Sequence, residues 1–186
     1  MRKLLPSAAL ALLVSTVGVF GQTTAASPAP ASGEPSCAGQ EAETTKDRFT
    51  GSVTLEAKLS PAAFKFQPYL RWTNEAPDVL QFEVMGSSES WRYLRCPTLF
   101  VLVDDKPVTV KNPSHGGEVE TGYVIEFVTG SIEWGDASSA LAAARKFEYK
   151  TCNDESNAPT EFVCKVRDLI AKATALRKAP EKQGGK

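Results

Sequence analysis

The chain contains a single histidine, His115, so any acid–base chemistry that needs an imidazole must use it. It lies in the stretch NPSHGGE, and Glu118 and Glu120 follow at a spacing that places both on one face of a strand. A histidine with two carboxylates could bind a metal ion, although a solvated strand face explains the two glutamates more simply. For catalysis, the sequence has no GxSxG turn or other nucleophile motif to accompany His115 as a base. The pattern favours an exposed histidine in a glycine-rich loop over 112–117.

Carboxylates are the other candidates for catalysis, and the sequence points to Asp104, Glu126 and Glu133. Asp104 stands beside Asp105 in DDKP, where a hairpin turn explains both residues through local hydrogen bonds to the backbone. Glu126 and Glu133 lie in or beside apolar strand-like stretches. A solvated sheet face is the default position for such glutamates, whereas an inward-facing one would be costly to bury and would hint at function.

Four cysteines are present, at positions 37, 96, 152 and 164. An even number behind a secretory leader predicts two disulfides, and proximity in the sequence favours Cys152–Cys164, which leaves Cys37–Cys96. The chain has no CxxC pair, so thiol redox catalysis is not indicated, and paired cysteines leave no zinc site.

The stretch CNDESNAPTEFVC has oxygen-bearing residues at alternate positions from Asn153, as in a calcium loop. That loop also needs Gly at its sixth position and Glu at its twelfth, which here are Ala158 and Cys164. We therefore expect no calcium site. No other cofactor motif is found in the sequence, so no cofactor is expected. The stretch is interpreted as a disulfide-closed connector between a strand and a helix.

The best candidate for binding is SESWRYLRC, which combines aromatic and arginine side chains as interaction hot spots do. Trp91 and Tyr93 are expected on one face, with Arg92 and Arg95 flanking them, and His115 completes the predicted set of binding residues. The alternative is that these aromatic residues fill the core and hold Cys96 in place.

The first 26 residues have the order of a secretory signal peptide: Arg2 and Lys3, an apolar run over 8–20, then small residues ending at Ala26. The run is too short to span a bilayer, so the mature chain is expected to be secreted or periplasmic, with no membrane span. Net charge is −1 and the charges are interspersed, which argues against nucleic acid as a partner.

Residues 27–46 are rich in Pro, Ala and Ser and are predicted to be a disordered linker, and 179–186 a flexible tail. Between them, 47–178 are predicted to form one domain. Alternating apolar residues indicate strands in most of 49–129, among which 99–103 is apolar throughout and is expected to be central and covered on both faces.

Helices are expected near the C-terminus, the first over 137–146 with Asp136 as its cap and the second from Thr160. Strands followed by helices predict an α+β fold: an antiparallel sheet of about six or seven strands, packed by two C-terminal helices. A β-barrel or sandwich with a helical appendage is the alternative architecture.

These observations favour a non-enzymatic, disulfide-stabilised module that binds another extracytoplasmic protein or an envelope component. An inhibitor-like protein is a second hypothesis, with the loop 112–117 or 153–160 inserted into a target enzyme. A hydrolase that depends on Asp104, Glu126 or Glu133 is a third. The sequence leaves the oligomeric state open.

Overall fold

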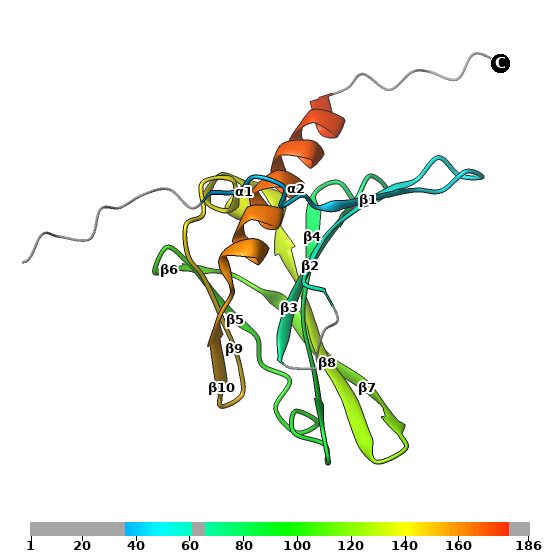
Figure 1. The fold of residues 1–186 in the computed structure, drawn as a ribbon, viewed down its shortest axis with the longest axis vertical. Coiled ribbons are helices and arrows are strands. Elements are labelled where there is room, and N and C mark those ends of the chain that lie inside the picture. Colours follow the sequence, from blue (N-terminus) through cyan, green and yellow to red (C-terminus); the bar gives the residue numbers. More distant parts are fainter. Residues whose placement is uncertain (1–35, 61–65, 179–186) are drawn as a thin grey trace, which may run out of the picture. The chain divides into compact units, whose positions relative to one another are not determined.

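The computed structural model describes residues 36–60 and 66–178, all of them within one compact unit, Glu34–Lys186. The predicted signal peptide, the linker up to residue 35 and the tail 179–186 lie outside the described residues. Within the described part, the fold is α+β as predicted, with two antiparallel sheets and two helices (Figure 1). Neither sheet closes on itself, so the barrel alternative is not supported.

The larger sheet has the strand order β1-β2-β3-β4-β8-β7. Its strands are β1 (Glu43–Lys46), β2 (Val53–Lys58), β3 (Gln67–Thr73), β4 (Val79–Ser88), β8 (Tyr123–Glu133) and β7 (Lys111–Glu120). The smaller sheet has the order β10-β9-β5-β6. Its strands are β10 (Asp154–Asn157), β9 (Phe147–Thr151), β5 (Phe100–Val103) and β6 (Lys106–Val108). The ten described strands thus exceed the six or seven predicted.

Strict alternation decides which face of the larger sheet is buried. In β4 the buried residues include Leu80, Phe82 and Val84, and in β8 Val128 and Ile132. Their polar neighbours point to the opposite face, because successive side chains of a strand alternate. Facing aromatic residues from the smaller sheet complete this core, such as Phe147, whose ring lies 5.5 Å from that of Phe82.

Two helices cover the core, α1 (Trp134–Ala142) and α2 (Thr160–Lys178). The helix α2 packs against α1, β2 and β3 and buries residues at helical spacing, among them Phe162, Val166, Leu169 and Ala173. Its predicted start at Thr160 is confirmed. The helix α1 begins earlier than predicted, and Asp136 lies within its first turn while the N-cap is Glu133, without a side-chain cap.

Regular structure begins before residue 47, inside the range 27–46 that was predicted to be a disordered linker. Residues 43–46 form β1, and Ala42 is buried. The Ala42 backbone N–H donates to Asp168 Oδ2 on α2 at 2.9 Å, and Cys37 is joined to Cys164 on the same helix. The described part of this segment is therefore fixed to α2 and belongs to the domain.

The disulfide pairing differs from the one predicted. The bonds are Cys37–Cys164 and Cys96–Cys152, not Cys37–Cys96 and Cys152–Cys164. Proximity in the sequence was misleading because β10 returns antiparallel to β9 directly after Cys152, which commits this stretch to a hairpin. The expected connector over 153–160 thus contains β10, which takes up half of it, and the first residue of α2.

Two further segments differ from expectation. In β5 only alternate residues are buried, and Phe100 and Leu102 are exposed, so this strand is covered on one face instead of two. The expected loop 112–117 lies within β7 at the edge of the larger sheet, where its proline is tolerated at a bulge.

Glycines in β7 serve close packing, not a turn. A Cβ atom on Gly116 would overlap the Phe127 ring, and one on Gly117 would overlap the Ile125 carbonyl oxygen and lie 2.8 Å from the Trp91 ring. Glycine at these two positions therefore allows the close approach of β8 and of both rings.

Candidate functional site

The candidate site is built around Glu126, a carboxylate on the inner face of β8. Its position follows from the alternation of that strand, which also directs Val124 and Val128 inward. Only 1% of Glu126 is exposed, the lowest exposure of any described acidic residue. Burial of this glutamate is the hint of function that the sequence analysis describes. A buried carboxylate requires hydrogen-bond partners.

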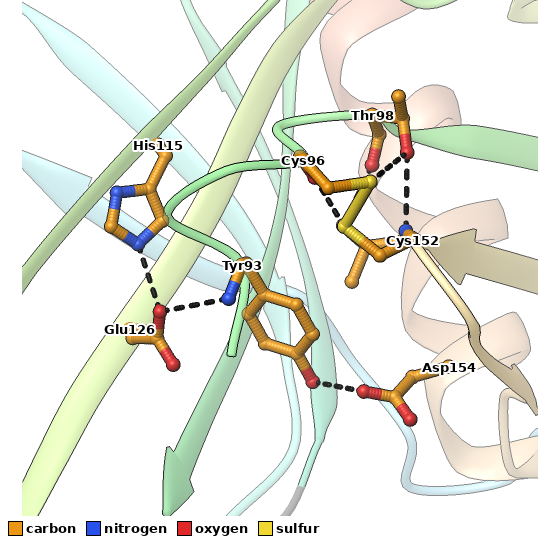
Figure 2. Close-up of a disulfide and its surroundings, with 8 residues drawn as sticks. Tyr93, Cys96, Thr98, His115, Glu126, Cys152 and Asp154 are labelled. Atoms are coloured by element: carbon orange, nitrogen blue, oxygen red, sulfur yellow. Dashed lines mark hydrogen bonds and ion pairs between the residues drawn. A yellow bond between two sulfur atoms is a disulfide. The ribbon is translucent and has the colours of Figure 1, made fainter. Parts of the chain in front are cut away.

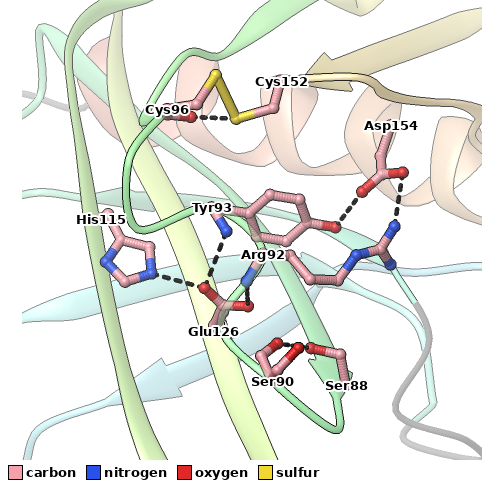
Figure 3. A network of polar contacts seen from close by, with 9 residues as sticks. All are labelled: Ser88, Ser90, Arg92, Tyr93, Cys96, His115, Glu126, Cys152 and Asp154. Atoms are coloured by element: carbon pink, nitrogen blue, oxygen red, sulfur yellow. Dashed lines mark hydrogen bonds and ion pairs between the residues drawn. A yellow bond between two sulfur atoms is a disulfide. The ribbon is translucent and has the colours of Figure 1, made fainter.

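Those partners come from residues 89–99, which connect β4 to β5 and are called the bridging segment below. The Arg92 N–H donates to Glu126 Oε2 at 2.7 Å, and the Tyr93 N–H donates to Oε1 at 3.0 Å (Figure 3). His115 Nε2 on β7 lies 3.0 Å from the same Oε1. Glu126 therefore holds the bridging segment and the edge strand to one point of β8.

Asp154 holds the other side of the bridging segment to the smaller sheet. Its Oδ2 accepts a hydrogen bond from the Tyr93 hydroxyl at 2.7 Å, and its Oδ1 accepts one from the Arg92 guanidinium at 2.8 Å (Figure 3). Burial raises the pKa of the Tyr93 hydroxyl above its usual range, and the hydrogen bond to Asp154 raises it further. Tyr93 is thus a protonated donor throughout the neutral range.

The Cys96–Cys152 disulfide fixes the same segment to the turn directly after β9 (Figure 2). Thr98 reinforces this link, because its hydroxyl accepts a hydrogen bond from the Cys152 N–H at 3.1 Å and its carbonyl accepts one from the Thr151 hydroxyl at 2.6 Å. The bridging segment is held by carboxylates on both sheets and by a covalent bond.

Two apolar side chains of this fixed segment remain in solvent. Trp91 is 39% exposed and Leu94 is 56% exposed. The Trp91 ring would lie 2.8 Å from a Cβ atom on Gly117, and it meets the His115 ring edge-on, with centroids 5.5 Å apart. Trp91 therefore packs against β7 and is still partly exposed to solvent.

The predicted binding residues are brought together in part. Trp91, Arg92, Tyr93 and His115 all lie around Glu126, as Figure 3 shows for the last three. Tyr93 is only 3% exposed, however, so it does not share an exposed face with Trp91, and it acts as a core residue. Arg95 is exposed, and neither carboxylate receives a hydrogen bond from it.

Three residues of the site were not identified from the sequence as binding or positioning residues: Leu94, Glu126 in its positioning role, and Asp154. The apolar residue in WRYLR was a usable signal for Leu94. Nothing in the sequence connects Asp154 with Tyr93, because their contact depends on the packing of two sheets.

The three carboxylates of the hydrolase hypothesis do not form one site. Glu126 and Glu133 are on opposite faces of β8, seven positions apart along the strand, which corresponds to roughly 23 Å. Glu133 forms an ion pair with Lys111 at 3.2 Å. Asp104 accepts hydrogen bonds from the Arg145 and Lys146 N–H groups beside the β5–β6 turn. Glycosidase carboxylates, for comparison, lie within about 10 Å of each other.

The arrangement around Glu126 is suited to positioning a segment. A carboxylate has about four lone-pair sites, and three are engaged by Arg92, Tyr93 and His115. Among residues 36–60 and 66–178, no group of three His, Cys, Asp or Glu side chains could hold a metal ion.

No protein-family model, curated protein or solved structure matches this chain. In the described part of the chain, neither helix has the length and apolar character needed to cross a membrane.

Proposed function

We propose that the protein is a non-enzymatic module that acts outside the cytoplasm and binds another extracytoplasmic protein or an envelope component through its bridging segment. Trp91 and Leu94 are the residues that contact the partner. Arg92 and Arg95 flank them on the same segment.

The observation that carries this proposal is the exposure of Trp91 and Leu94 on a segment that is otherwise fixed at both ends. Exposed apolar side chains on a mobile loop lose conformational freedom on binding, and that loss weakens affinity. A segment held by Glu126, Asp154 and a disulfide is ordered before the partner arrives. Exposed Trp is also among the residues most enriched in binding hot spots.

The two disulfides support the proposed location, because such bonds persist in secreted and periplasmic proteins and are rare in the cytoplasm. This agrees with the leader-like sequence over 1–26, which we interpret as a cleaved signal peptide.

The proposal is tested by affinity capture from the native extracellular or periplasmic extract. Wild type is compared with Trp91→Ala/Leu94→Ala and with Val119→Ala, a control that removes an exposed apolar side chain from β7. The expected result is a partner retained by wild type and by the control and lost with the double variant. Equal capture by all three proteins would contradict the proposal.

A further inference from the structure

The turn between β1 and β2 presents the most exposed large apolar side chain of the described residues. Phe49 is 97% exposed at this turn. Residues 46–51, from the last residue of β1 into the turn, are called the hairpin tip below. In Figure 1 the hairpin extends from the edge of the larger sheet beyond β3 and β4. Because Phe49 is almost fully exposed, no described part of its own chain covers it.

The hairpin tip is ordered by its own hydrogen bonds. Asp47 Oδ1 accepts from the Phe49 N–H at 2.6 Å and from the Thr50 N–H at 3.2 Å, and these bonds lower the pKa of Asp47. The Gly51 N–H donates to the Asp47 carbonyl at 3.0 Å, with Gly51 at a φ of +76°. At the base, Asn74 Oδ1 accepts from the Val53 N–H at 2.8 Å. Phe49 therefore projects from a preformed turn.

A second feature, in the smaller sheet, has the shape to receive such a side chain. A depression of about 140 Å³ lies on the outer face of this sheet, lined by Phe100, Leu102, Glu148, Tyr149, Lys150 and Glu155. Phe100 and Leu102 are 58% and 36% exposed. A cavity of about 150 Å³ with apolar walls is large enough to bind benzene, so one phenylalanine ring matches the size of this depression.

The hairpin tip carries two cations, and the depression is lined by two carboxylates and one lysine. Lys46 and Arg48 precede Phe49 in the hairpin tip, and neither has an ion-pair partner among the residues that the structure describes. At the rim of the depression Glu155 is 64% exposed in its side chain and lies 3.7 Å from Lys150, a loose pair that leaves the carboxylate accessible. A cation of the tip could approach Glu155 when Phe49 enters the depression.

We infer that this protein associates with itself, with Phe49 of one copy occupying the Phe100–Leu102 depression of a second copy and Arg48 approaching Glu155 there. Such a contact joins two different surfaces of one molecule, so it is head-to-tail and can repeat. A single aromatic anchor predicts weak association, which becomes apparent only at high concentration.

A membrane surface is the competing target for an exposed aromatic residue with two cations close to it in the chain. One phenylalanine offers it little hold, because even a whole myristoyl chain gives only marginal membrane binding. The depression, in contrast, matches both the size and the charge of the hairpin tip. The observations thus favour a second copy.

The test is sedimentation velocity on the form of the protein that accumulates in its host, from about 10 µM to 1 mM. Wild type is expected to show a mass that rises with concentration. Phe49→Ala is expected to weaken association by about thirtyfold or more, as for a hot-spot residue, without change in thermal unfolding. Val119→Ala and Trp91→Ala should associate like wild type, which separates this contact from the proposed partner surface.

A charge exchange tests the pairing across the contact. Arg48→Glu and Glu155→Arg are each expected to weaken association, and a chain with both substitutions should regain it. The inference is overturned if wild type stays monomeric at 1 mM, if Phe49→Ala associates as wild type does, or if the double variant fails to recover. Binding of monomeric wild type to anionic phospholipid vesicles that depends on Phe49 would assign the hairpin tip to membranes instead.

Discussion

Glu126 is the residue on which the position of the bridging segment depends most. Glu126→Ala removes the acceptor for two buried N–H groups and the partner of His115. Unsatisfied buried donors cost about 1–3 kcal/mol each, so we expect the free energy of unfolding to fall by about 3 kcal/mol. Urea denaturation measures this value.

The matched control is Glu118→Ala, on the neighbouring strand β7, where the side chain is exposed. It should change the free energy of unfolding by less than about 0.5 kcal/mol. If Glu126→Ala were no more destabilising than this control, the positioning role of Glu126 would be wrong.

Tyr93 gives the fold a dependence on alkaline pH. Its pKa is raised in the folded state by burial and then by Asp154. The unfolded tyrosine ionises near pH 10, so the stabilisation is complete below that pH and is lost as pH rises toward the folded pKa. Tyr93→Phe should lower stability by about 1 kcal/mol at pH 7 and make its decline above pH 10 less steep.

The comparison is made by urea denaturation of wild type and Tyr93→Phe at pH 7, 9, 10 and 11. Tyr69 and Tyr149 also have raised pKa values, so the variant keeps part of the decline. Parallel curves for the two proteins across this range would show that Tyr93 does not contribute to it.

At the scale of elements, the two disulfides connect the N-terminal segment to α2 and the bridging segment to the turn directly after β9. Digestion without reduction should yield peptides joined as Cys37–Cys164 and Cys96–Cys152. Because these bonds span 127 and 56 residues, the chain-entropy model assigns them about 5 and 4 kcal/mol at most. Paired Cys→Ser variants should therefore lose several kcal/mol, and a Cys152–Cys164 peptide would contradict the fold.

Elements whose formation depends on nearby residues were predicted correctly from the sequence. The prediction of a helix from Thr160 was correct because the apolar residues of this stretch recur at helical spacing. The turn at Asp104 and Asp105 was predicted correctly because both residues tolerate the positive φ found there. The strand β4 followed from its strict alternation.

Features that depend on packing between distant segments could not be predicted in this way. The glycines of β7 were interpreted as a loop because the sequence does not reveal that Phe127 and Trp91 lie against them. The polar stretch of β10 has no apolar alternation, and its register with β9 appears only in the fold. The disulfide pairing depends on that same register.

The candidate site, too, could be predicted only in those features that depend on residue type and not on packing between distant segments. Trp91, Arg92 and His115 were identified by residue type, and the structure brings them together. The burial of Tyr93 and the role of Asp154 depend on how the two sheets meet. Residue types therefore located the site, while tertiary packing decided which of its side chains face solvent.

At the scale of the whole molecule, the bridging segment is a fixed connection between two sheets, and it leaves Trp91 and Leu94 in solvent. Phe49 and the Phe100–Leu102 depression involve other strands. Partner binding and self-association can thus be altered by separate substitutions.

The central claim is tested most directly by the affinity of the captured partner for wild type and for Trp91→Ala, measured by titration calorimetry. With Trp91 as a hot spot, the dissociation constant should increase by about thirtyfold or more, while Val119→Ala leaves it within about threefold. A Trp91→Ala protein that is folded and binds the partner as tightly as wild type would contradict the claim that the bridging segment is the binding surface.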